Sequence, residues 1–145
     1  MVLKREVVER RLKELDRILA ELRRHPVESL DEYRCDLSRQ RILERGLIAA
    51  AGIVLDVADH ILSGHFGDHP DTYEASLRGL RDRSVISEEL YAGIEGLGGL
   101  RNILVHRYLD IDSAEVVAHR ERMLELMPRF ASEILSWIES ATIAE

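Results

Sequence analysis

The spacing of large apolar residues near the N-terminus constrains the fold more than any other feature of the sequence. They recur at intervals of four, three, four and three positions, at Val8, Leu12, Leu15, Leu19 and Leu22. These intervals place side chains on one face of an α-helix, whereas a half-buried strand needs an apolar residue at every second position. The pattern predicts a helix over about residues 3–24 with a core-facing stripe, ended by His25-Pro26.

A second helix is predicted to follow after a short connection. Ser29 with Glu32 three residues later has the pattern of a capping box. The apolar pattern then continues for about 30 residues, so the helix is expected to kink near Gly46 or Gly52. Its expected core-facing residues are Tyr33, Leu37, Leu43, Leu47, Val54, Leu55, Ala58, Ile61 and Leu62. The stretch 63–70 is dense in helix breakers and is predicted to be a loop.

Three more helices are predicted in the second half of the chain. Asp71 with Glu74 starts a short one that carries Tyr73, Leu77 and Leu80. Ser87 caps another over about residues 88–108, and Asp112 with Glu115 opens a last one to about residue 142, kinked at Pro128. No segment alternates with the period of a strand. We therefore expect one all-α domain over residues 1–145, an up-and-down bundle of four to five helices.

Composition excludes some function classes. The formal net charge is −7, which argues against a polybasic protein that holds nucleic acid by bulk charge. The single cysteine, Cys35, can form no internal disulfide and no cysteine-based zinc site. The longest apolar run, residues 47–55, is far shorter than the 20 or so residues that span a bilayer. We expect a cytoplasmic protein without membrane contact.

The best candidate for chemistry is the segment Arg101-Asn102-Ile103-Leu104-Val105-His106-Arg107-Tyr108. An arginine and a histidine five positions apart mean little alone, but the only asparagine of the chain follows this arginine directly, and a tyrosine lies two positions after the histidine. The segment resembles the Arg-polar-…-His motif of the HEPN superfamily. The tyrosine makes it most similar to HepT-like toxins of the HEPN–MNT toxin–antitoxin class, and the resemblance extends over most of the chain.

The resemblance implies a homodimeric endoribonuclease whose partners are RNA and a cognate antitoxin, a minimal nucleotidyltransferase (MNT). It also implies that the antitoxin transfers AMP to Tyr108, which would place negative charge beside Arg101 and His106 and silence the site. The alternative role for Tyr108 is an interface or core aromatic residue. DNA is not an expected partner, and neither a cofactor nor a metal is expected.

The residue types suit RNA cleavage independently of the family. Attack by a ribose 2′-hydroxyl needs one proton removed, another delivered to the leaving 5′-oxygen, and charge on the phosphorus stabilised. The ordinary pKa of histidine suits His106 to the proton transfers, and the guanidinium of Arg101 can grip phosphate oxygens. Asn102 can donate to the phosphate or orient a neighbour. Such a reaction needs no metal and leaves a 2′,3′-cyclic phosphate and a 5′-hydroxyl.

Helix geometry adds a constraint. Arg101 and His106 lie about 140° apart on an ideal helix, whereas Asn102 and His106 lie about 40° apart. One helix therefore presents Arg101 and His106 poorly to a single phosphate, and a two-fold dimer would bring the two groups together across one cleft. The competing interpretation pairs Arg101 with a surface carboxylate and makes His106 an interface histidine.

Three weaker alternatives remain open. The glycines at positions 93, 96, 98 and 99 could form a phosphate nest, although close helix packing is the preferred explanation. Three histidines and three aspartates between Asp56 and His69 could suggest a metal site, which their spacing disfavours. The whole chain could also be a non-catalytic partner or regulatory subunit of a nucleotidyltransferase, which the net charge favours and the Arg101–His106 pair disfavours.

Overall fold

The computed structural model describes residues 3–106 and 111–144, with side chains up to residue 141. All regular secondary structure in these residues is helical, which confirms the all-α prediction. The elements are α1 (Arg5–Arg23), α2 (Leu30–Arg34), α3 (Leu37–Ile61), the π-helical turn η1 (Leu62–Phe66), α4 (Tyr73–Asp82), α5 (Glu88–Ile94), α6 (Leu97–His106) and α7 (Ser113–Ala144).

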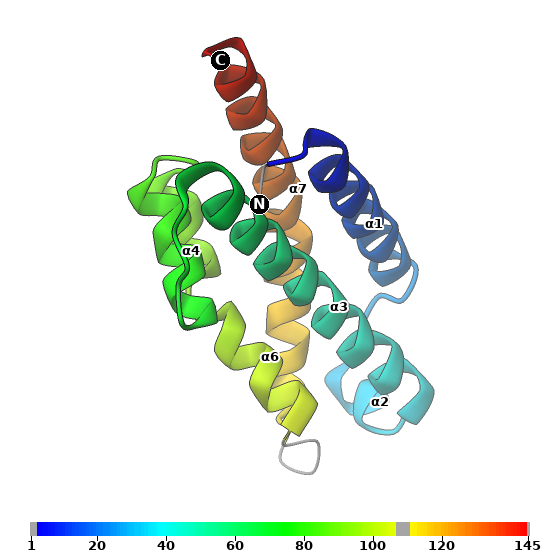
Figure 1. Cartoon of the computed structure of the whole chain (residues 1–145). Coiled ribbons are helices and arrows are strands. Elements are labelled where there is room, and N and C mark those ends of the chain that lie inside the picture. The colour runs from blue at the N-terminus through cyan, green and yellow to red at the C-terminus, as the bar shows by residue number, and fades with distance from the viewer. Residues whose placement is uncertain (1–2, 107–110, 145) are drawn as a thin grey trace.

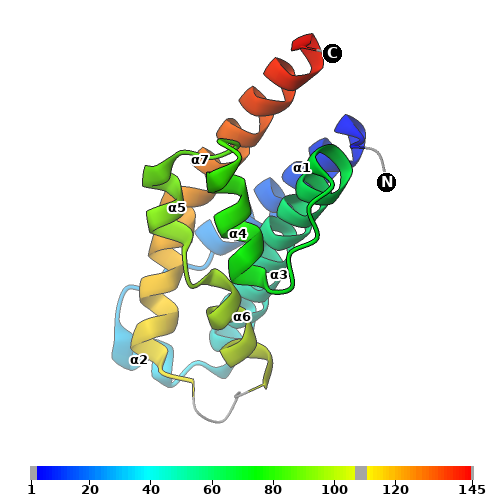
Figure 2. The same cartoon turned by 60° about the vertical axis from the view of Figure 1, so that its left-hand side comes forward.

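Helix α3 is the centre of the bundle and contacts α1, α4, α6 and α7 (Figure 1). Its buried residues include Leu43, Leu47, Val54 and Ile61, none of which is exposed to solvent. The long helix α7 lies against α1, α3 and α5 (Figure 2). The core therefore lies along α3, and the shorter helices α4, α5 and α6 cover one side of it.

The predicted stripe of α1 is confirmed. Val8, Leu12, Leu15, Leu19 and Leu22 are all buried, and the helix ends at Arg23, just before His25-Pro26. A buried arginine of α7, Arg120, donates a hydrogen bond from Nη2 to the carbonyl oxygen of Leu22 at 2.8 Å. The same carbonyl also accepts from the backbone nitrogen of His25 at 3.2 Å, so Arg120 adds a tertiary hydrogen bond that joins α7 to the C-terminal turn of α1.

The predicted second helix is in fact two helices. Ser29 caps α2 as expected, accepting a hydrogen bond from the Glu32 backbone nitrogen. The helix then ends at Arg34, and the carboxylate of Asp36 accepts from the backbone nitrogen of Arg39 and starts a new helix. Leu37, at the first position of α3, is 60% exposed, so its assignment to the core was wrong.

Helix α3 runs without a break through both of its glycines. A Cβ atom at Gly46 would lie 2.7 Å from Leu22, so this glycine allows α1 to approach α3 closely. The predicted loop at 63–70 begins instead as the π-helical turn η1, which ends at Gly67 in the left-handed region with φ of 69°. The bundle thus turns from α3 into α4 through one more helical turn than the sequence pattern indicated.

The start of α4 also differs in detail from the prediction. The capping side chain is that of Thr72, which accepts from the backbone nitrogen of Ala75, rather than that of Asp71. Leu77 and Leu80 are buried as expected, whereas Tyr73 is 45% exposed. The first turn of α4 therefore presents an aromatic ring to solvent.

The predicted fourth helix is divided as well. Ser87 caps α5 by accepting from the Leu90 backbone nitrogen, as its position in the sequence predicted. The chain then leaves the helical conformation at Glu95, and Gly96 takes a positive φ of 87° before α6 begins. Glycine adopts this conformation without the steric cost that a Cβ atom imposes. The break turns α6, the helix that carries the motif, away from the axis of α5.

Helix α7 begins where the sequence indicated. Asp112 accepts a hydrogen bond from the backbone nitrogen of Ala114, and the helix continues through Pro128 without interruption. The expected kink at Pro128 stays a prediction.

One helical run, Leu37–Phe66, is long and apolar enough to cross a membrane by length and composition alone. It consists of α3 and η1, and its buried residues form the middle of the core. We therefore interpret it as the core helix of the bundle.

Candidate active site

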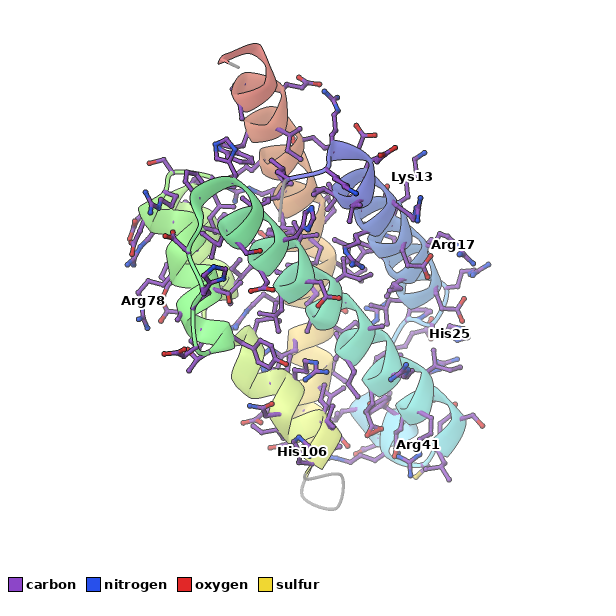
Figure 3. All side chains as sticks on the ribbon, viewed as in Figure 1. Lys13, Arg17, His25, Arg41, Arg78 and His106 are labelled. Atoms are coloured by element: carbon purple, nitrogen blue, oxygen red, sulfur yellow. The ribbon has the colours of Figure 1, made fainter. Side chains whose placement is uncertain are left out.

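The motif residues Arg101, Asn102 and His106 lie on α6, at one end of the bundle. Leu97, Gly98, Leu100 and Leu104 are buried and fix the inner face of this helix against its neighbours. The outer face is left to solvent, and His106 is the last residue of this helix that the structure describes (Figure 3). The apolar spacing that makes α6 a helix therefore also decides which motif residues point outward.

Asn102 and His106 are both exposed and lie one turn apart. Because α6 is a regular α-helix, they share one face, as predicted from the spacing. Within the described part of the chain, neither side chain has a hydrogen-bond or ion-pair partner. An amide and an imidazole on one open face can reach the same phosphate group of a bound polymer.

Arg101 lies to one side of that face. Its Cζ atom is 5.5 Å from the centre of the Tyr73 ring, a cation–π contact between α6 and α4. Among the described residues it has no carboxylate partner, so the alternative in which Arg101 serves a surface ion pair receives no support. The separation of Arg101 from His106 by about 140° on the single chain stays a prediction from ideal helix geometry.

Apolar side chains surround the open face of α6. Ile103 is 40% exposed and Val105 is 38% exposed. Large apolar side chains are mostly buried in folded domains, whereas these two remain open to solvent beside the motif.

The glycines before the motif do not form an open phosphate nest. The carboxylate of Glu74, on α4, accepts hydrogen bonds from the backbone nitrogens of Gly96 at 3.1 Å and Gly98 at 3.3 Å. An anion therefore already occupies the N-terminus of α6.

A Cβ atom at Gly93 would lie 2.7 Å from Leu126, and one at Gly98 would lie 2.7 Å from the Cβ atom of Tyr73. Close packing against a neighbouring helix explains the glycines at positions 93 and 98, which is the explanation that the sequence analysis favoured.

A groove of about 690 Å³ lies between α3, α4 and α6, on the Tyr73 side of the motif. We refer to it as the α4 groove. Its lining includes Asp56 and Asp59 of α3, Asp71 just before α4, Tyr73 at the start of α4, and Gly99 and Asn102 of α6. Asn102 is therefore shared between the groove and the exposed face that carries His106.

The histidines and aspartates that could have suggested a metal site take part in separate contacts with other residues. His60 accepts a hydrogen bond at Nε2 from the Lys4 backbone nitrogen, and the ring of His65 packs edge-on against Phe66 and Trp137. Asp68 forms a two-pronged ion pair with Arg83, which lowers the pKa of that carboxyl group. In the described ranges no three His, Cys, Asp or Glu side chains gather so as to hold a metal ion.

Two functional neighbours were missed from the sequence. The sequence pattern places Tyr73 only on the predicted helix and Glu74 only at its start, whereas in the structure both residues contact α6. Nothing in a single sequence indicates that the first turn of α4 lies against the motif helix. Tyr108, the predicted modification site, lies outside the described residues.

Comparison with solved structures shows a known helical fold. A cytosolic protein from Bacillus subtilis, YutE, matches with a TM-score of 0.83 and 21% identity, over 97% of this chain and 95% of that one. A tri-AMPylated HEPN toxin of Shewanella oneidensis, solved in complex with an MNT antitoxin, matches with a TM-score of 0.82 and 20% identity, over 92% and 99% of the chains. The fold is that of HEPN toxins.

Sequence comparison defines the family. Residues 7–134 match the HepT-like family, described as Ribonuclease HepT-like. The tRNA nuclease HepT of Aphanizomenon flos-aquae (strain 2012/KM1/D3) is 33% identical over 133 residues, covering 91% of this chain and 90% of the relative. This chain therefore belongs to the HepT-like ribonuclease family.

Proposed function

We propose that this chain is the toxin of an HEPN–MNT toxin–antitoxin pair and acts as a metal-independent endoribonuclease. The observation that carries the proposal is the exposure of Asn102 and His106 on one face of α6, with the Arg101 guanidinium at its edge. The relative from Aphanizomenon flos-aquae, which is named a tRNA nuclease, supports RNA as the substrate class.

In the proposed reaction, the ribose 2′-oxygen attacks the adjacent phosphorus while the bond from phosphorus to the 5′-oxygen breaks. His106 accepts the 2′-hydroxyl proton and returns a proton to the leaving 5′-oxygen, a role worth about 10²–10⁴ in rate. Arg101 binds the phosphate oxygens and stabilises the charge that develops on them. Asn102 donates to the same phosphate. The products carry a 2′,3′-cyclic phosphate and a 5′-hydroxyl.

The site is completed by a second copy of the chain. Arg101 and His106 lie on different sides of α6, so one protomer alone presents them poorly to one phosphate. A two-fold axis across the outer face of α6 would bury Ile103 and Val105, which are exposed in the single chain, and would place the Arg101 of one protomer near the His106 of its partner. Each dimer would then hold two composite sites.

An MNT antitoxin is the proposed partner that silences the toxin. The Shewanella oneidensis HEPN toxin with a similar fold is described as tri-AMPylated and in complex with such an antitoxin. By analogy, AMP on Tyr108 would add negative charge two positions after His106. That charge would compete with RNA phosphate for Arg101, and the bulk of the nucleotide would block access to the site.

The second candidate function, a non-catalytic partner of a nucleotidyltransferase, is favoured by the net charge of −7, which opposes RNA binding. The two functions are separated by RNA cleavage with purified protein. His106→Ala should lower the cleavage rate at least about 100-fold, whereas the exposed loop histidine variant His69→Ala should retain the wild-type rate. Wild-type cleavage by His106→Ala would overturn the catalytic assignment.

The composite site has a sharper test. Neither Arg101→Ala nor His106→Ala should cleave RNA alone. When the two are mixed and allowed to exchange protomers, half of the dimers are mixed, and each has one intact composite site. The mixture should therefore recover about a quarter of the wild-type activity. Mixing that restores nothing, in a sample shown to have exchanged protomers, would contradict shared sites.

A further inference from the structure

We propose that the α4 groove is a nucleobase subsite, in which the ring of Tyr73 stacks against a base next to the cleaved phosphate. The inference rests on the proposed ribonuclease function and extends it to the way in which the RNA strand is held. The structural basis is the position of one exposed aromatic side chain between the Arg101 guanidinium and a groove that reaches Asn102.

The exposure of Tyr73 needs an explanation. It is the first residue of α4, and 45% of its surface remains open to solvent although its Cβ atom packs closely on Gly98. A tyrosine needed only for the core would be turned inward, as Tyr33 is with 2% exposure. The contact with α6 therefore fixes the Cβ end of the Tyr73 side chain, while its aromatic ring lines the groove.

The ring has a suitable neighbour for nucleic acid. The Arg101 guanidinium lies 5.5 Å from the ring centre, so a planar cation and an aromatic ring are arranged next to each other. Single-stranded RNA is commonly held by such combinations, in which bases stack on aromatic side chains and arginine contacts the backbone. Tyr73 is the aromatic residue that lines the groove beside the motif helix.

The charges of the groove favour a base over a phosphate. Asp59 and Asp71 line it and have no ion-pair partner among the described residues, while Asp56 pairs only with Arg11, at 4.0 Å. These carboxylates repel the phosphate backbone, but they accept hydrogen bonds from the N–H groups on base edges. The strand would therefore leave its phosphate at Arg101 and His106 and insert a base into the groove.

The contact between Tyr73 and Arg101 sets the spacing between the base and the phosphate. The Arg101 guanidinium, which binds the phosphate in the proposed reaction, lies 5.5 Å from the centre of the Tyr73 ring. A base stacked on Tyr73 and a phosphate bound by Arg101 of the same protomer can therefore belong to the same or to adjacent nucleotides. A volume of about 690 Å³ accommodates a nucleobase with its ribose.

The test combines a change in the protein with a change in the RNA. The substrates are short oligonucleotides with a single cleavable ribose, with the base either present or removed on the 5′ or the 3′ side of the scissile phosphate. For wild type, removing the stacked base at one of these two positions should lower kcat/KM about tenfold or more. Tyr73→Ala should lose the same factor on the intact substrate and nothing further on the abasic one.

This coupling separates stacking from a structural role. If Tyr73 only held Arg101 in place, Tyr73→Ala would slow the intact and abasic substrates equally, and the proposal would be overturned. Tyr73→Phe keeps the ring and should stay within about twofold of wild type on every substrate. A wild-type chain that cleaves no RNA would instead refute the proposed function, so the two failures are distinguishable.

Discussion

The carboxylate of Glu74 lies 3.1 Å from the backbone nitrogen of Gly96 and accepts its hydrogen bond. The same carboxylate accepts a second bond from Gly98, so a side chain of α4 caps the N-terminus of α6. Capping groups usually come from the residue just before a helix. Here the neighbouring helix supplies the cap, because Gly96 occupies that position and has no side chain.

Removing the charge of this cap should destabilise the protein. Glu74→Gln retains one oxygen but replaces the other acceptor with an amide donor, which faces a backbone N–H group. We expect the free energy of unfolding to fall by about 1–2 kcal/mol in urea titration. Glu95→Gln, at an exposed position next to the same turn, is the matched control and should change stability by less than about 0.5 kcal/mol. Equal stability of the two variants would contradict the capping role.

The two adjacent glycines of α6 should respond in opposite ways to alanine. A Cβ atom at Gly98 would lie 2.7 Å from the Cβ atom of Tyr73, whereas one at Gly99 would have no atom within 4 Å. Gly98→Ala should therefore destabilise by about 1–3 kcal/mol. Gly99→Ala should stabilise by up to about 1 kcal/mol, since alanine favours the helix. Melting curves of the two variants test this, and a stable Gly98→Ala would disprove the close contact.

Two leucines of α3 offer a similar comparison for the core. Leu47 is fully buried, whereas Leu37 on the same helix is 60% exposed. Leu47→Ala should cost about 2–5 kcal/mol through lost burial and a cavity. Leu37→Ala should cost less than about 0.5 kcal/mol. A large loss for Leu37→Ala in denaturant titration would show that this residue is covered in the folded protein.

Stability should fall in mildly acidic solution because of His119. Burial lowers the pKa of His119, and Arg122 lowers it further, against an opposing effect of Glu115. The unfolded chain therefore binds more protons than the folded one as the pH drops below about 6.5. The free energy of unfolding should decrease from there down to the folded-state pKa, and His119→Gln should show a smaller decrease. An unchanged pH dependence in that variant would refute the assignment.

Much of the helical pattern could be predicted because it rests on local rules. The stripe of α1 and the caps at Ser29, Ser87 and Asp112 depend on residues within one turn, and all are present in the structure. The two breaks were missed for different reasons. The apolar pattern around Asp36 and Gly96 is compatible with a continuous helix. The chain breaks at these two positions because the following helix must take a new direction to pack against the bundle.

For the site, the sequence identified the motif and the shared face of Asn102 and His106, which follow from spacing on one helix. It did not identify the contacts of Tyr73 and Glu74 with α6, because they join residues more than 20 positions apart through tertiary packing. The relation between Arg101 and His106 in a dimer is still a prediction.

The central claim is that His106 moves protons during metal-independent cleavage of RNA, and end-group analysis of the products tests it most directly. Purified wild type in excess EDTA should convert RNA to fragments with a 2′,3′-cyclic phosphate and a 5′-hydroxyl, and His106→Ala should produce no such fragments above background. Loss of cleavage in EDTA, or fragments that begin with a 5′-phosphate, would contradict the account.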